Sequence, residues 1–399
     1  MIRLILLLML LPLSASARDF ASWLEADLWP AARAAGVSRS TFDGALRGVA
    51  PDWSLPGVAR PGTTPPRAQH QAEFGAPARY FRHVTSSART GRDMAARHAS
   101  ALRRAEAATG VPGHIVLAIW GRESAYGAAA LPHDAVQVLA TNSFAGGPRA
   151  AYFKDELVAA LRIIEAGHAA PRGLRSSWAG ALGQPQFMPS SFLEHAVDGT
   201  GDGRADIWGS DTDTIASIAS FLAHHGWVKG RDWGFEVRVP ASVSCSLEGP
   251  DQGRAIRDWE AMGITRVSGK PFPAHERSGV GYLMMPAGRL GPAFIVTPNF
   301  YVLKDYNMSD LYALFVGHAG DRIAYGGGDF AAPWQRVDTM LRSDVAAMQR
   351  GLEALGHDVG GADGLAGFRT RRSIGRWQDA TGRAATCFPD AQVINALRR

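Results

Sequence analysis

One carboxylate stands out because of its position in the sequence. Glu123 lies near the end of a strongly apolar run, Ile115 to Tyr126, whose pattern predicts a buried helix that begins at Pro112. Burial of a carboxyl group in an apolar helix disfavours its ionised form and raises its pKa. A carboxyl that stays protonated near neutral pH is what general acid catalysis on a glycosidic oxygen requires. The residues alone also allow a structural Glu that pairs with Arg122 or with a helix end.

A second segment, residues 178–192, combines small residues with two amides in the sequence WAGALGQPQFMPSSF. This pattern predicts a groove in which the backbone approaches a ligand closely and amides bond to sugar hydroxyls and N-acetyl groups. Gly121 and Gly127, on either side of Glu123, likewise predict open space for a bulky sugar. The alternative for residues 178–192 is a glycine-rich packed loop.

The elements that position these residues are mostly helical. Apolar residues at helical spacing predict short helices in 18–50 and longer ones at 93–108, 152–166 and 214–225. Short strands are expected at 235–239 and near Tyr282 and Ile295. Pro333 marks the end of the large domain. After it, the pattern predicts a three-helix unit, with Val345, Met348, Leu352 and Leu355 on the first stripe and Thr370 as the N-cap of the second helix.

The composition is that of a globular chain of more than one domain. The chain has 399 residues, of which 46% are hydrophobic and 20% charged, so it can bury a sizeable core and wholesale disorder is excluded. A formal net charge of +5 favours an anionic partner. No run of Lys and Arg with interleaved aromatic residues favours nucleic acid, so we expect no nucleic-acid partner.

The N-terminus predicts export. A short basic start precedes an apolar run, Leu4 to Leu13, and then the small-residue pattern Ala15-Ser16-Ala17, which is typical of a cleavable signal peptide over residues 1–17. The run is about half of the roughly 20 residues that span a bilayer, and no Cys follows it for a lipid anchor. We therefore expect a periplasmic mature chain that begins near Arg18 and has no transmembrane segment.

The two cysteines, Cys245 and Cys387, fall in different predicted domains. An oxidising compartment permits a disulfide between them. Two unpaired thiols are equally compatible with the sequence. No CxxC or HExxH spacing predicts a structural zinc site.

Five ordered motifs between about residues 20 and 330 resemble the membrane-bound lytic transglycosylase B family, which acts on peptidoglycan. They are the segments around Glu123, 140–157, 178–192, 196–208 and 298–312. The resemblance implies a lysozyme-like, predominantly helical α+β fold. It implies that Glu123 is the catalytic residue and that five further residues bind substrate: Ser177, Gln186, Tyr306, Asn307 and Tyr312. Tyr and Asn can stack on and hydrogen-bond to N-acetylated sugars, although core packing would equally explain Tyr306 and Tyr312 on the residues alone.

The resemblance also accounts for the lack of an evident second carboxylate, which ordinary glycosidases need. It implies that Glu123 protonates the leaving oxygen between N-acetylmuramic acid (MurNAc) and N-acetylglucosamine (GlcNAc). Glu123 then deprotonates the muramic acid 6-hydroxyl, which attacks its own anomeric carbon and gives a 1,6-anhydro end. An intramolecular nucleophile needs no positioned water. The alternatives are a hydrolytic muramidase and a non-catalytic cell-wall-binding scaffold.

An acidic loop in the fourth motif predicts a cation site. Asp198, Thr200 and Asp202 match the start of a calcium loop, with oxygen ligands at alternate positions. The resemblance suggests that Asp213 supplies the late carboxylate, and Arg204 would contribute only its backbone carbonyl. We expect a structural calcium ion and no cofactor for the chemistry. A metal-free Asp/Gly turn is the alternative.

The unit after Pro333 resembles a three-helix peptidoglycan-binding domain, through its segments 345–356 and 361–378. Its expected contribution is tethering, which raises the effective concentration of the enzyme on an insoluble polymer. The predicted organisation is a signal peptide at 1–17, a catalytic domain at 18–332 and a peptidoglycan-binding domain at 338–399. The expected partners are peptidoglycan and the cell-wall synthesis machinery.

Overall fold

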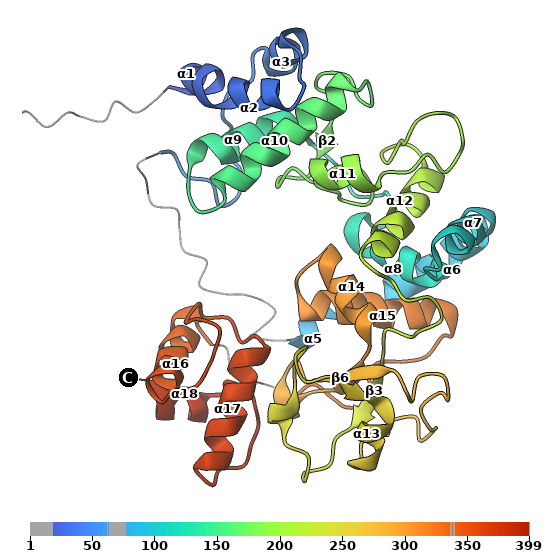
Figure 1. Cartoon of the computed structure of the whole chain (residues 1–399), viewed down its shortest axis with the longest axis vertical. Helices are drawn as coiled ribbons and strands as arrows, with labels where there is room; N and C mark the ends of the chain where they lie inside the picture. Colours follow the sequence, from blue (N-terminus) through green and yellow to red (C-terminus); the bar gives the residue numbers. More distant parts are fainter. Residues whose placement is uncertain (1–18, 62, 64–76, 336, 338–339, 399) are drawn as a thin grey trace, which may run out of the picture. The chain divides into compact units, whose positions relative to one another are not determined.

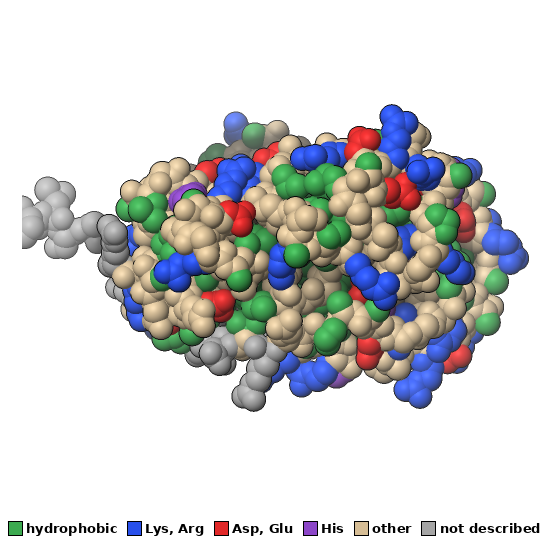
Figure 2. Space-filling view, turned by 90° about the horizontal axis from the view of Figure 1, so that it is seen from below, with side chains coloured by type: hydrophobic (Ala, Val, Ile, Leu, Met, Phe, Trp, Pro, Cys, Tyr) green, Lys and Arg blue, Asp and Glu red, His purple; other side chains and the backbone are tan. Residues whose placement is uncertain are grey.

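The computed structural model describes residues 19–61, 63, 77–335, 337 and 340–398 (Figure 1). The predicted signal peptide, residues 1–17, lies outside this range. Among the described residues, no helix has the length and apolar character needed to cross a bilayer. On the face that Figure 2 shows, Lys and Arg side chains are interspersed with acidic and apolar ones rather than gathered into one patch.

The chain divides into two compact units. The first contains the described parts of Met1–Pro65, Pro132–Ala181 and Met188–Ser190, and the second contains those of Pro66–Leu131, Leu182–Phe187 and Ser191–Arg399. The chain therefore passes between the units several times.

The first unit is built on two packed helices, α9 (Ala135–Ala145) and α10 (Ala150–Glu165). Asp134 caps α9, because its carboxylate accepts the backbone N–H groups of Val136 and Gln137. The other elements are α1 (Phe20–Trp23), the π-helix η1 (Leu24–Leu28), α2 (Trp29–Ala34), α3 (Arg39–Leu46), and the two-stranded sheet of β1 (His133–Asp134) and β2 (Arg175–Ser176). The short helices predicted in 18–50 are thus present.

A helical bundle forms the part of the second unit that carries Glu123. Its central helix is α8 (Gly113–Ser124), which packs against α15 (Asp310–Ala324) and α6 (Val84–Arg97). Six consecutive residues of α8, 115–120, are buried, which explains why the run is apolar around its circumference. The bundle also includes α5 (Pro77–Tyr80), α7 (Ala99–Thr109), α12 (Asp211–His224) and α14 (Pro298–Tyr306). Helix α11 (Pro189–His195) belongs to the second unit from Ser191 onward.

The helix predicted at 93–108 is in fact two helices, α6 and α7, that meet at His98. The His98 ring packs edge-on against Trp120 at 5.5 Å, and its Nε2 lies 3.4 Å from Asp211. These tertiary contacts, which the helical periodicity does not contain, coincide with the break at His98.

Between α12 and α14 the chain forms an antiparallel five-stranded sheet, whose strand order is β4-β6-β7-β3-β5. Its strands are β3 (Gly234–Arg238), β4 (Arg254–Ala255), β5 (Thr265–Arg266), β6 (Val280–Met284) and β7 (Ala293–Val296). The register pairs Phe235 with Ile295 and Leu283 with Ile295, so the central strands contribute side chains to one core. The three predicted strands are confirmed. The connections contain α13 (Ile256–Ala261) and two 3-10 turns, η2 (Cys245–Leu247) and η3 (Gly288–Leu290).

The C-terminal part is the predicted three-helix unit, made of α16 (Arg342–Ala354), α17 (Phe368–Ala380) and α18 (Ala391–Leu397). Two details of its prediction are wrong. Leu355 follows α16 and is exposed instead of completing the apolar stripe. Thr370 lies inside α17 and is buried, where its hydroxyl receives a hydrogen bond from Gln349 at 3.0 Å, so it does not cap the helix.

A disulfide joins Cys245 to Cys387, with Cα atoms 6.1 Å apart. The sequence left this pairing open. Both cysteines are buried in the core beneath the sheet, so the bond attaches the three-helix unit to the sheet region across 142 residues of sequence.

Candidate active site

Glu123 lies in the last turn of α8, as the apolar run predicts. Helix α8 ends immediately afterwards because Ala125, Tyr126 and Gly127 all adopt left-handed backbone conformations, with φ of 50°, 60° and 80°. The surrounding protein desolvates the carboxyl and raises its pKa to about 7. The predicted acid therefore lies at the end of a largely buried helix and is itself half-buried.

Two tyrosines lie near Glu123, Tyr306 at the end of α14 and Tyr312 on α15, the helix that packs against α8. The hydroxyl of Tyr312 donates a hydrogen bond of 2.5 Å to Glu123 Oε1. The ring of Tyr306 stacks near that of Tyr312, with centroids 6.4 Å apart and planes within 11°. Burial, followed by the nearby Glu123 charge, raises the pKa of both phenols well above the usual value, so both hydroxyls stay protonated and act as donors.

The alternative of a Glu123–Arg122 pair does not describe this structure. The guanidinium of Arg122 lies over the rings of Tyr80 and Phe315, at 4.5 and 5.0 Å from their centroids. Its charge lowers the pKa of Glu123 less than the Tyr312 hydrogen bond does, and burial outweighs both. Of the groups in the described chain that shift the pKa of Glu123, none is a second carboxylate.

The amide segment 182–187 forms a tight loop next to the end of α8. Tyr306 donates from its hydroxyl to the carbonyl of Pro185 at 2.7 Å. Gln186 has a left-handed backbone, with φ of 56°, and its side chain bonds to the carbonyl of Gly183 at 2.8 Å. The structure therefore brings four of the predicted residues into one region: Glu123, Gln186, Tyr306 and Tyr312.

Gln184, which sequence reasoning did not select, has the more central structural role of the two amides. It is buried, and its Oε1 accepts a 2.8 Å hydrogen bond from the indole of Trp120 on α8. Its Nε2 donates to the carbonyl of Trp208 and to the Asp211 carboxylate. The sequence offered only the pair of amides on either side of Pro185 as a signal, and nothing in it distinguishes the buried from the accessible one.

The space predicted beside Gly121 and Gly127 is filled by protein, so that prediction is wrong. A Cβ atom at Gly121 would lie 2.5 Å from the Tyr126 ring. A Cβ atom at Gly127 would lie 2.4 Å from Gln184 Oε1. These glycines allow the turn after α8 to fold back closely over the helix.

The other two predicted residues each have their own contacts. Asn307 is the exposed C-cap of α14, and its side chain accepts a hydrogen bond from the Ser309 amide. Ser177 belongs to the first unit, where its hydroxyl accepts the Ala181 amide at 3.3 Å.

The carboxylates of Asp198 in the acidic loop and Asp213 in α12 both accept backbone amides of the loop. Asp213 is fully buried, and its carboxylate accepts the amides of Gly199 and Thr200, at 2.9 and 3.1 Å. Asp198 accepts amides from farther along the loop, which lowers its pKa. In the described chain, two groups of His and acidic side chains have all their ligand atoms within 4.8 Å of one another, and neither includes a residue of this loop.

The remaining loop residues have these contacts: Thr200 Oγ1 donates to Asp198 at 3.0 Å, and the Arg204 amide donates to Asp202 Oδ1 at 2.9 Å. The residue types suit an oxygen-liganded cation, and the carboxylates are engaged by backbone amides rather than directed at one point.

Comparison with known proteins gives matches to both parts of the chain. Residues 19–321 match the family of the transglycosylase SLT domain, and residues 342–397 match a putative peptidoglycan-binding domain. The membrane-bound lytic murein transglycosylase B of Escherichia coli K12 is 34% identical over 228 residues, which cover 56% of this chain and 60% of that protein.

Solved structures extend the similarity to almost the whole chain. SltB3 from Pseudomonas aeruginosa in complex with NAG-NAM-pentapeptide is 36% identical, with a TM-score of 0.85 over 96% of this chain and 100% of that one. The lytic transglycosylase Slt35 of Escherichia coli in complex with calcium is 32% identical, with a TM-score of 0.55 over 64% of this chain and 80% of that one. The chain thus belongs to the lytic transglycosylase family of the SLT type, with a lysozyme-like catalytic fold followed by a peptidoglycan-binding helical domain.

Proposed function

We propose that this protein cleaves the β-1,4 bond between MurNAc and GlcNAc in peptidoglycan without water and leaves 1,6-anhydroMurNAc ends. The observation that carries the proposal is the environment of Glu123, a single desolvated carboxyl whose pKa is raised to about 7 and whose hydrogen-bond donor is a neutral phenol. Such a group can give up a proton and take one back at the same pH.

The first half of the reaction uses Glu123 as an acid. Because Tyr312 donates to Oε1, we assign the transferable proton to Oε2. The proton passes to the glycosidic oxygen as the bond from that oxygen to the MurNAc anomeric carbon breaks. The phenol hydrogen bond then stabilises the carboxylate that remains.

The second half uses the same carboxylate as a base. It removes the proton of the MurNAc 6-hydroxyl while that oxygen forms a bond to the anomeric carbon. Glu123 ends protonated, ready for the next cycle, and no water is consumed. Holding both reacting groups in one sugar supplies a large effective concentration, so a second carboxylate is not needed.

Substrate contacts are proposed for the residues that match the family motifs. Tyr306 and Asn307 come from the end of α14, Tyr312 from α15 and Gln186 from the tight loop, and Ser177 is included on its family motif alone. SltB3 has been solved with NAG-NAM-pentapeptide and with NAG-anhNAM-pentapeptide. The anhydro sugar in the second complex is the type of product that the proposed reaction makes.

The same proposal includes the organisation and location of the chain. We assign residues 1–17 to a signal peptide, 18–332 to the catalytic domain and 338–399 to a peptidoglycan-binding domain, with the mature protein in the periplasm. The wall-binding domain holds the enzyme on its polymer. Contacts with wall-synthesis proteins remain part of this proposal.

A structural calcium ion is proposed for the acidic loop, held by Asp198, Thr200, Asp202, the Arg204 carbonyl and Asp213. The support is the oxygen-rich donor set, the same loop in the family motif and the calcium complex of Slt35. No step of the reaction involves this ion. Calcium should raise the melting temperature of the wild type and leave that of Asp202→Asn less changed. Equal stabilisation of both would contradict the assignment.

Digestion of purified peptidoglycan by wild type and by Glu123→Gln, with products identified by mass spectrometry, tests the activity. Anhydro-ended muropeptides, about 18 Da lighter than the hydrated species and lost in the variant, are expected. Reducing ends in their place would mean a hydrolytic muramidase. Binding without cleavage by either protein would indicate a scaffold.

A further inference from the structure

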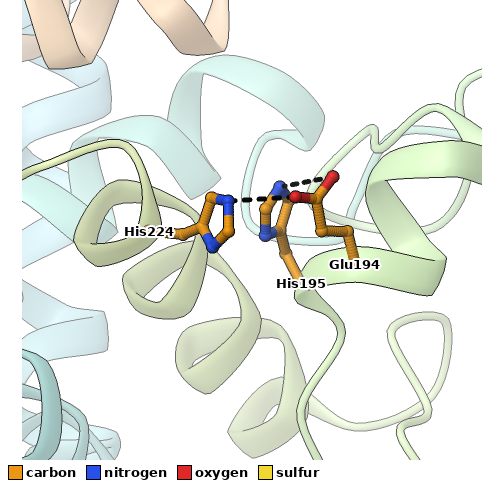
Figure 3. Close-up of side chains that lie close together, drawn as sticks. All are labelled: Glu194, His195 and His224. Atoms are coloured by element: carbon orange, nitrogen blue, oxygen red, sulfur yellow. Dashed lines mark ion pairs between the residues drawn. The ribbon is translucent and has the colours of Figure 1, made fainter.

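The C-terminal ends of two helices meet in a cluster of imidazole and carboxylate side chains. Glu194 and His195 are the last residues of α11, and His224 is the last residue of α12. The two imidazole rings lie 4.8 Å apart between centroids. In Figure 3 the Glu194 carboxylate faces both rings.

One carboxylate bridges the two imidazoles. Glu194 Oε1 lies 2.9 Å from Nε2 of His224, and Oε2 lies 3.7 Å from Nε2 of His195. A tetrahedral ion with ligand bonds of about 2.0–2.1 Å separates neighbouring ligand atoms by about 3.3 Å. The two observed distances fall on either side of this value, so small side-chain rotations would place all three atoms around one ion.

His195 is held in place as a preorganised metal ligand would be. Its side chain is 3% exposed, and its Nδ1 is buried with no hydrogen-bond partner among the described residues. A neutral ring with its proton on Nδ1 presents the Nε2 lone pair to the cluster.

The position of the cluster favours a cation and allows it to enter. The last carbonyls of α11 and α12 contribute partial negative charge at this point. Glu194 and His224 are each 57% exposed, so one side of the cluster is open to solvent. An ion bound there would keep free coordination positions for water.

A second group of similar composition differs in a decisive way. Asp232, His275 and Glu276 also lie close together, but Glu276 is fully buried and forms a 2.6 Å ion pair with Arg231. A guanidinium already occupies the position that a metal would take. No Lys or Arg of the described chain forms an ion pair with the cluster at the ends of α11 and α12.

We propose that Glu194, His195 and His224 form a binding site for one divalent transition-metal ion of the zinc class. Two imidazoles and one carboxylate are typical ligands of such ions, whereas the acidic loop offers only the oxygen donors that calcium prefers. The bound ion connects the end of α11 to the end of α12. In α12, Phe221 packs against both His195 and Tyr306, with ring centroids 4.9 and 4.7 Å away. The site therefore stabilises the aromatic packing that positions Tyr306.

The test is zinc binding to the full mature chain, without a histidine tag and with its disulfide intact. The protein is freed of metal with a chelator, and Zn²⁺ is then titrated in competition with a chromophoric indicator. Excess Ca²⁺ is present so that oxygen-rich sites are filled. His224→Ala and Glu194→Gln remove exposed ligands and should leave the fold intact by circular dichroism, and His83→Ala removes an exposed histidine elsewhere.

We expect one Zn²⁺ per chain in the wild type and in His83→Ala. Affinity should fall in His224→Ala and in Glu194→Gln by at least the roughly 10- to 100-fold that loss of an outer-shell partner causes. Co²⁺ should give an intense visible absorption band in the wild type that both ligand variants lose. Absence of stoichiometric binding, or equal binding by all four proteins, would overturn the proposal and leave the cluster as an ion pair.

Discussion

Glu123 and Glu248 are both desolvated carboxyls in the second unit, but the groups that surround them differ. Glu248 is 1% exposed, and the guanidinium of Arg371 donates from Nε to both of its oxygens at 3.1 Å. Arg371 also bonds to Asp310, the first residue of α15. Among the described residues, Glu123 has one hydrogen-bond donor, the neutral Tyr312, and the Arg122 guanidinium lies over two aromatic rings instead of pairing with it.

The comparison teaches that burial alone does not produce a catalytic acid. Burial raises the pKa of Glu248 as it does that of Glu123, but the charge and hydrogen bonds of Arg371 act in the opposite direction. Through Glu248 and Asp310, Arg371 of α17 also connects the C-terminal unit to helix α15, which carries Tyr312. A carboxyl that is desolvated without a cation keeps its proton at neutral pH.

Replacement of Glu123 should separate activity from folding. Glu123→Gln keeps the shape and the hydrogen bond from Tyr312 but removes the transferable proton. We expect a loss of turnover of about 10²- to 10⁴-fold or more, the contribution of general acid–base catalysis. Release of anhydromuropeptides from purified peptidoglycan measures this loss, and activity within a factor of three of the wild type would contradict the assignment.

Replacement of Arg371 should have the converse effect, on stability. Arg371→Met removes the cation that pairs with buried Glu248 and leaves only the Met285 amide as a donor, which costs about 3–5 kcal/mol. The matched control is Arg369→Met on the same helix, because Arg369 is exposed and pairs loosely with Asp358 at 3.6 Å, a contact of about 0–1 kcal/mol. Urea unfolding followed by circular dichroism compares them. Equal losses in the free energy of unfolding would show that the buried Arg371–Glu248 pair contributes no more than the exposed Arg369–Asp358 pair.

The stability of the wild type should depend on pH in a way that the stability of Glu123→Gln does not. The folded pKa of Glu123, about 7, is above its unfolded value of 4.5, so its favourable contribution is complete below pH 4.5 and is lost as the pH rises to about 7. The wild type should lose up to about 3 kcal/mol relative to the variant across this window. Denaturation midpoints at pH 4 and pH 8 measure the difference, and a constant offset between the proteins would contradict the raised pKa.

The smallest expected effect concerns Tyr312. Tyr312→Phe removes one hydrogen bond to Glu123, worth about 1–2 kcal/mol, and should lower activity about tenfold. Because that bond lowers the pKa of Glu123, its loss should move the alkaline limb of the pH–activity profile to higher pH. A purely structural role for Tyr312 would reduce activity without moving the limb.

Local patterns in the sequence predicted the elements well. The apolar run around Ile119 predicted helix α8, and alternating apolar residues predicted β3, β6 and β7, because burial on one or all faces leaves a periodic signal. The exceptions depend on contacts between distant residues. Thr370 looked like a cap because capping residues are recognised locally, yet its hydroxyl is used by Gln349 inside the core.

In the candidate site, too, only the features that depend on local sequence could be predicted. Glu123 was found because its own neighbours are apolar, whereas its bond to Tyr312 spans 189 residues and no local pattern encodes it. Gly121 was interpreted as open space because the sequence does not reveal that Tyr126 folds back over it. The Cys245–Cys387 bond likewise depends on which core buries both residues.

The most direct test of the account is the ionisation of Glu123 itself. Carboxyl ¹³C signals of glutamate-labelled wild type and Glu123→Gln, followed by NMR through a pH titration, identify the resonance that the variant lacks. We predict that this carboxyl titrates with a pKa of about 7. A pKa near the ordinary value of 4.5 would mean that Glu123 is a carboxylate at neutral pH and would contradict its role as the acid.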